Sequence, residues 1–164
     1  MGRFRLLLMA VLGAVSLVAI GGSTAAADES HFLIKFDSMT PVTGAAVGNP
    51  NDRGIVGGGK PWAITFGKGE LSADGRLHVR VKGLVIPVAP FNGSNPLTQF
   101  GVTVSCLTPG IVNVSSSSLF NTGPSGDATI NTTLALPGNC MDPIVFVTSP
   151  GGAWFAMSNA EDDE

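Results

Sequence analysis

Tyrosine is absent from the 164 residues, and cysteine and histidine occur only twice each. The absence of tyrosine removes a residue that often stacks on sugars or acts as an acid or base. The two cysteines form no C-x-x-C motif and the histidines stand far apart, so no zinc set is complete. Charged residues make up only 13%, while glycine (22) and proline (11) are abundant. This composition favours an exported β-protein with many turns over a helical bundle.

Residues 1–27 have the three parts of a secretory signal peptide. Arg3 and Arg5 give a positive start, Leu6 to Ile20 is apolar, and small residues precede Asp28. We predict cleavage after Ala27, a secreted or extracellular location, and no transmembrane segment in the mature chain. A retained membrane anchor is the alternative, but the apolar run is shorter than the roughly 20 residues that span a bilayer.

Removing the signal peptide leaves seven Lys and Arg against twelve Asp and Glu, a net charge of −5 for residues 28–164. An acidic chain of this kind argues against nucleic acid and anionic membrane as main partners. Residues 161–164, with the sequence EDDE, are expected to be a solvated acidic tail. Residues 28–160 are then expected to form one domain, which is long enough to bury its own core.

Alternation of apolar and polar residues, typical of strands, recurs along the mature chain. In the stretch RLHVRVKG the apolar side chains are expected to point inward. His78, Arg80 and Lys82 are expected to point outward, either as a solvated strand face, which is the commoner case, or as a small basic stripe. Asp74-Gly75 predicts the turn of a hairpin over 62–82. We predict an all-β, single-domain antiparallel β-sandwich of about eight strands, with a small β-barrel as the alternative. The expected strands lie within residues 31–36, 62–66, 76–82, 100–106, 111–115, 127–136, 143–149 and 153–157.

The long segment 40–61 contains RGIVGGGKP, which only partly matches two functional motifs. Pro61 stands where a phosphate-binding loop needs Ser or Thr, and Gly54 precedes Ile55 where protease activation needs Arg or Lys. Calcium binding at Asp52 is less favoured than an Asx turn. The three glycines at 57–59 are expected to supply positive φ at a bend before the Trp62 strand. No catalytic residue, cofactor or metal site is predicted, and Trp62 and Trp154 are expected in the core.

Cys106 and Cys140 are the only cysteines, and an exported chain meets an oxidising compartment. We therefore predict a disulfide between them with a structural role. Closing a loop of this 34-residue separation stabilises a fold by about 4 kcal/mol in the chain-entropy model.

Three blocks follow the signal peptide in order: GGGKPW at 57–62, VSC at 104–106 and PIVFVTSPGGAWFA at 143–156. In these blocks the chain resembles a group of small secreted bacterial proteins that have no assigned activity. The resemblance implies a bacterial, exported, single-domain protein and brings no catalytic residues with it.

The first functional hypothesis is a non-catalytic secreted structural or binding protein of the cell envelope or extracellular space. Its expected partner is a protein or another envelope component. The alternative is a secreted hydrolase or carbohydrate-active enzyme that uses an acidic pair such as Asp37 and Glu70. A third possibility is a ligand carrier with an apolar cavity beneath Gly57 to Gly59.

Overall fold

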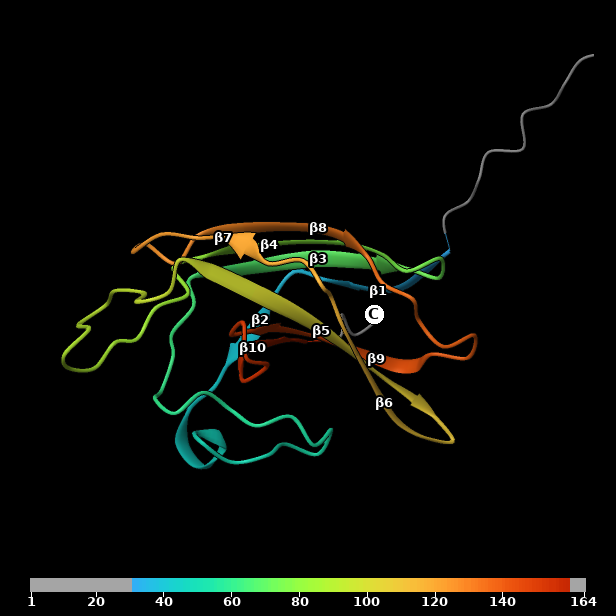
Figure 1. Cartoon of the computed structure of the whole chain (residues 1–164), viewed down its shortest axis with the longest axis horizontal. Helices are drawn as coiled ribbons and strands as arrows, with labels where there is room; N and C mark the ends of the chain where they lie inside the picture. Colours follow the sequence, from blue (N-terminus) through green and yellow to red (C-terminus); the bar gives the residue numbers. More distant parts are fainter. Residues whose placement is uncertain (1–30, 160–164) are drawn as a thin grey trace, which may run out of the picture.

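The fold is built almost entirely from antiparallel strands, as the computed structural model shows for residues 31–159 (Figure 1). The predicted signal peptide and the acidic tail lie outside these described residues. Ten strands and one short 3-10 turn, η1, occur in the described part of the chain, against the eight strands expected. They are β1 Phe32–Phe36, β2 Met39–Pro41, η1 Gly44–Ala46, β3 Phe66–Ser72, β4 Arg76–Lys82, β5 Gln99–Thr108, β6 Gly110–Ser115, β7 Phe120–Asn121, β8 Ala128–Thr133, β9 Met141–Thr148 and β10 Trp154–Ser158.

The strands form two sheets that pack as a sandwich, which confirms the predicted fold class. One sheet has the order β1-β3-β4-β8, and the other has the order β2-β10-β9-β5-β6, with β7 also paired to β5. Figure 1 shows the four-stranded sheet above the six-stranded sheet. Because the two sheets remain separate, the alternative of a small closed barrel is wrong.

The core lies between the sheets and follows from period-2 alternation. In β4, Leu77, Val79 and Val81 are buried while the residues between them are exposed, as predicted. The opposing sheet contributes Val102 and Val104 of β5, which are also buried. The central strand β9 lies between β5 and β10, as its continuous apolar run indicated.

The hairpin forms, but its first strand is not the one predicted. β3 begins at Phe66, whereas residues 62–65 make only a bridge between Ala63 and Val85. In β3 the inward positions belong to Gly67, Gly69 and Leu71, so Phe66 points outward and is 39% exposed. The prediction failed here because the inward glycines carry no hydrophobic signal, whereas pairing with β4 decides which residues face inward.

Trp62 nevertheless belongs to the core, as predicted. Its ring stacks on Phe155 with the centroids 4.0 Å apart and meets Phe100 edge-on at 6.3 Å. Trp154 is equally buried, on the other face of the six-stranded sheet, where it packs edge-on against Phe146. Aromatic pairs in these geometries contribute about 1 kcal/mol beyond the area that they bury.

Residues 42–62, here called the covering loop, run from β2 toward β3 and lie beneath the six-stranded sheet (Figure 1). Trp154 N donates to Val56 O and Gly58 N donates to Trp154 O, each at 2.9 Å. The loop therefore crosses between the sheets, as expected, and also covers part of the outer face of one of them.

The glycines of the covering loop do not have the role expected from the sequence. Positive φ occurs at Gly44, Gly48 and Gly54 but not at residues 57–59. A Cβ on Gly57 would lie 2.1 Å from Ala46 O, and a Cβ on Gly58 would lie 3.0 Å from the rings of Phe155 and Trp62. Glycine is thus required at 57 for close approach to the backbone, and at 58 a Cβ would crowd the two rings. The rings of Phe155 and Trp62 fill the space beneath Gly58. The carrier hypothesis requires an apolar cavity in this place.

Candidate functional site

The outer face of the four-stranded sheet collects polar side chains from all four strands in register. Lys35 of β1 lies opposite Glu70 of β3, Glu70 lies opposite His78 of β4, and His78 lies opposite Asn131 of β8. These four residues are exposed, because alternation directs every second side chain of these strands away from the core. His78 Nδ1 and Asn131 Oδ1 form a hydrogen bond across the sheet.

The next row along the sheet places two cations side by side. Lys68 of β3 lies directly opposite Arg80 of β4, and Thr129 of β8 follows Arg80. Like charges at directly opposed positions destabilise a sheet by up to about 1 kcal/mol. Among the described residues, the two ion pairs within 4.0 Å involve Arg53 and Arg76, so neither relieves this repulsion.

This surface, the cationic face, holds most of the positive charge of the fold. Five of the seven Lys and Arg within residues 31–159 lie on it: Lys35, Lys68, Arg76, Arg80 and Lys82. The same range has six Asp and Glu, so its net charge is +1, and the acidity expected for the mature chain belongs to residues 28–30 and 160–164. The described fold is therefore close to neutral overall, and its cations are concentrated on one sheet, where Glu70 also lies.

Two aromatic side chains accompany these cations. Lys35 Nζ lies 4.0 Å from the centroid of the Phe32 ring, a cation-π contact. Phe66 lies opposite Lys82 at the other end of β3 and β4. The face thus offers charge together with small apolar surfaces.

Two shallow depressions adjoin on the cationic face. One, of about 630 Å³, extends from Phe32 to Thr133, and the other, of about 520 Å³, is lined by Lys35, Lys68 and Arg80. Glu70 and His78 line both depressions, so they form one continuous trough across the sheet. A trough of this shape suits an extended chain better than a compact small molecule.

The hairpin turn at one end of the face is fixed by Asp74. Its carboxylate accepts hydrogen bonds from the Ser72 hydroxyl at 2.7 Å and from Arg76 N at 3.3 Å, and it pairs with the Arg76 guanidinium at 2.9 Å. The Ser72 hydrogen bond, followed by the Arg76 amide, lowers the pKa of Asp74 below its ordinary 3.8. The Asp74 carboxylate compensates the positive charge of Arg76. Lys68 and Arg80, which lie opposite each other, take part in neither of the two ion pairs among the described residues.

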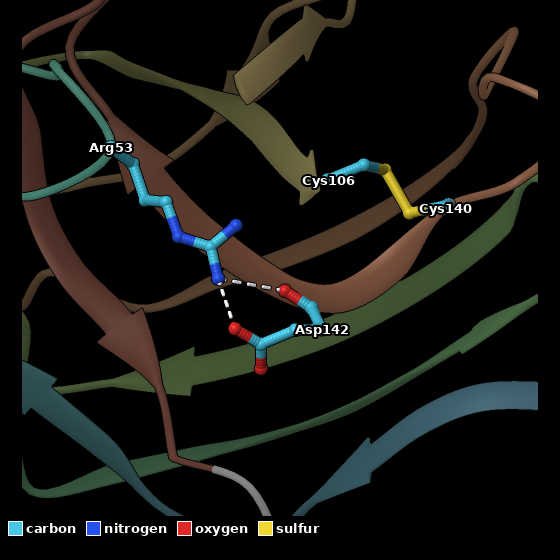
Figure 2. The surroundings of a disulfide bond; sticks show 4 residues. All are labelled: Arg53, Cys106, Cys140 and Asp142. Atoms are coloured by element: carbon cyan, nitrogen blue, oxygen red, sulfur yellow. Dashed lines mark hydrogen bonds and ion pairs between the residues drawn. A yellow bond between two sulfur atoms is a disulfide. The ribbon is translucent and has the colours of Figure 1, made fainter. Parts of the chain in front are cut away.

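The disulfide between Cys106 and Cys140 is present, as predicted, with the Cα atoms 4.8 Å apart (Figure 2). It joins β5 to the segment that enters β9. Two residues beyond Cys140, Asp142 accepts hydrogen bonds from Arg53 of the covering loop through its main-chain and side-chain oxygens (Figure 2). Asn113 Nδ2 of β6 also donates to Arg53 O at 2.9 Å. This cluster fastens the covering loop to the sheet on the side remote from the cationic face.

The acidic residues singled out from the sequence lie in different settings. Glu70 faces Lys35 in the trough, whereas Asp37 follows the end of β1 and lines neither depression. Near Asp52, the Asn51 side chain accepts from Arg53 N at 3.0 Å, which is the Asx turn that was favoured over a calcium site. Within residues 31–159, no three His, Cys, Asp or Glu side chains gather as a metal-binding group.

The sequence favours a solvated strand face for His78, Arg80 and Lys82 over a basic stripe, and Lys68 and Lys35 were not predicted beside them. Lys68 was missed because residues 62–66 were assigned to the strand in place of 66–72. The observed turn spans three residues, 73–75, and places residue 68 opposite residue 80. A two-residue Asp74-Gly75 turn, which the sequence suggests, would place residue 69 there instead, so the turn signal alone gives the wrong register.

In the part of the chain that the structure describes, no helix is long and apolar enough to cross a membrane. Comparison with known proteins adds no relative: no family model, no curated protein and no solved structure matches this chain.

Proposed function

We propose that this chain is a secreted, non-catalytic binding protein that holds an anionic polysaccharide of the cell envelope on its cationic face. The observation that carries the proposal is the opposed pair Lys68 and Arg80, which line one of the two depressions of the exposed trough. A fold that keeps two like charges in register there accepts a cost that an anionic ligand would relieve. Carboxylates bound by Lys and Arg form charge-assisted hydrogen bonds, which are stronger than neutral ones.

The predicted export signal supports a polysaccharide as the anion, because an exported protein meets acidic glycans of the envelope rather than nucleic acid. The resemblance to small secreted bacterial proteins supports the same location. The trough runs across four strands, so it offers several cations to successive sugars of one polymer chain. Binding of this kind weakens with salt, since it depends on charge.

The test measures binding of the oxidised mature protein to polygalacturonate by calorimetry. The ligand control is the same polymer with its carboxylates methyl-esterified, which keeps the backbone and removes the charge. The double variant Lys68→Gln/Arg80→Gln is expected to bind polygalacturonate roughly tenfold more weakly or worse. The matched protein control is Lys60→Gln, which removes an exposed cation of the covering loop and should bind as the unaltered protein does.

Equal binding of the charged and esterified polymers would overturn the proposal, as would unchanged binding by the double variant. The hydrolase alternative predicts a different result in the same mixture. If Asp37 and Glu70 act as an acidic pair, the polymer shortens with time and Glu70→Gln stops the shortening. The binding proposal predicts that the polymer keeps its full length after prolonged incubation.

A further inference from the structure

The two sheets have four edges, and three of them carry features that discourage pairing with another chain. A free edge exposes unpaired N–H and C=O groups, and native proteins protect it with charge, proline, short strands or bulges. The edge strand β1 contains Lys35 and a register break between Phe32 and Ile34. The edge strand β2 has only three residues and ends at Pro41.

The third edge, β8, is flanked by the segment that contains β7. Ser116 Oγ and Thr132 Oγ1 form a hydrogen bond of 3.2 Å there. The fourth edge is β6, which borders the six-stranded sheet and has no such neighbour among the described residues on its free side.

β6 lacks every one of these protective features. Its pairing with β5 is regular, without a bulge, from the pair Thr108–Gly110 at one end to the pair Thr103–Ser115 at the other. It contains no charged residue and no proline, and Ile111 and Val112 are 48% and 37% exposed. An uncharged, regular strand with exposed branched side chains is a template for a further strand.

The backbone of β6 also presents hydrogen-bonding groups on its free side. Ser116 N donates to Val102 O at 3.0 Å, which continues the ladder by one hydrogen-bonded pair. Antiparallel alternation then directs the N–H and C=O groups of Ile111, Asn113 and Ser115 away from β5. No backbone hydrogen bond from another described segment reaches these three residues.

We propose that β6 pairs antiparallel with β6 of a second copy of this chain, which joins two six-stranded sheets across a twofold axis. Electrostatics favours a second copy at this edge. The mature chain carries a net charge of −5, so two copies repel overall, but residues 83–126 contain no charged residue. β6 itself therefore adds no like-charge contact to such a pairing. The proposal does not depend on the polysaccharide.

The sequence of β6 is compatible with pairing to itself. A pairing centred on Asn113 places Val112 of each copy opposite Val114 of the other on one face of the sheet. On the other face Asn113 meets Asn113 and Ile111 meets Ser115. Met141 is 51% exposed and, like Ile111, lies beside Leu107 in the sheet, which extends the apolar surface. One short strand buries less than the roughly 800 Å² per partner of a standard interface. The dissociation constant of the dimer should therefore be about 10 μM or higher.

The test is sedimentation equilibrium of the oxidised mature protein from about 1 μM to about 500 μM, a range in which a weak dimer populates both states. Ile111→Lys and Val112→Lys place a charge on the edge and should each leave a monomer at every concentration. The matched control is Val88→Lys, which alters an aliphatic residue that is 41% exposed outside β6 and should still dimerise. Circular dichroism of each variant shows whether it is folded.

Hydrogen exchange of the unaltered protein provides a second measurement, which does not depend on whether any variant folds. The amides of Ile111, Asn113 and Ser115 should exchange more slowly at high than at low concentration. The proposal is overturned by a monomer throughout the range, by a dimer that persists in both folded lysine variants, or by protection that rises elsewhere and not in β6.

Discussion

The guanidinium of Arg53 donates to the main-chain oxygen of Asp142 at 2.9 Å and pairs with its carboxylate, although 89 residues separate them along the chain. The Arg53 side chain is 9% exposed and the Asp142 side chain is 69% exposed, so the contact is a buried cation that reaches a solvated anion. It joins the centre of the covering loop to the start of β9.

Replacing Arg53 by Met keeps most of the apolar stem and removes the donors. Because Asp142 stays hydrated, we expect a moderate loss of about 1–3 kcal/mol in the free energy of unfolding. The measurement is urea denaturation, together with hydrogen exchange of residues 49–58, which should become faster. Asp52→Asn, an exposed change in the same loop, should alter the stability by less than about 0.5 kcal/mol. Unchanged exchange in Arg53→Met would show that the ion pair does not hold the loop.

The disulfide should account for much of the stability of the fold. Replacing Cys106 and Cys140 by Ala opens a loop of 34 residues in the unfolded chain, and we expect a loss of about 4 kcal/mol in urea denaturation. Mass spectrometry of the exported protein without reductant should find both thiols oxidised. Two free thiols in that sample would contradict the predicted state.

Three glycines separate the cost of positive φ from the cost of a steric clash. Gly126 has φ +71°, and a Cβ there would lie 2.0 Å from Leu84 O. Gly93 has φ +91° with nothing within 4 Å, and Gly110 has neither constraint. Thermal unfolding should show Gly126→Ala losing about 3 kcal/mol or more, Gly93→Ala about 1 kcal/mol, and Gly110→Ala close to none. Similar losses for Gly126→Ala and Gly93→Ala would mean that the close approach to Leu84 is unimportant.

Asp74 should make the hairpin sensitive to acid. Its pKa in the fold is lowered below the ordinary 3.8 by the Ser72 hydroxyl, the Arg76 amide and the Arg76 charge. A lowered pKa contributes stability above the ordinary value, and this contribution is lost as the pH falls below 3.8 through the lowered pKa. An NMR titration should show the Asp74 carboxyl protonating below pH 3.8, and Asp74→Asn should reduce the loss of stability in that window. A carboxyl that titrates at or above its ordinary value would refute the hydrogen-bonded turn.

The sequence was sufficient for the fold class because alternation in β4 and β5 and the Asp74-Gly75 turn are local signals. It was insufficient for β3, where Gly67 and Gly69 fill inward positions without hydrophobic side chains. The cationic face was only partly predictable for the same reason, since Lys68 takes its direction from the pairing with β4. The contact of Arg53 with Asp142 depends on how the covering loop crosses the sheet, and no short-range pattern encodes it.

Binding of an anionic polysaccharide to the cationic face can be tested residue by residue by an NMR titration with polygalacturonate. We expect the amide signals of Lys35, Lys68 and Arg80 to shift most, and we expect salt to reverse the shifts. Shifts concentrated in the covering loop or in β6 would contradict binding at the cationic face. The absence of shifts at polymer concentrations that saturate other proteins binding acidic polysaccharides would contradict it as well.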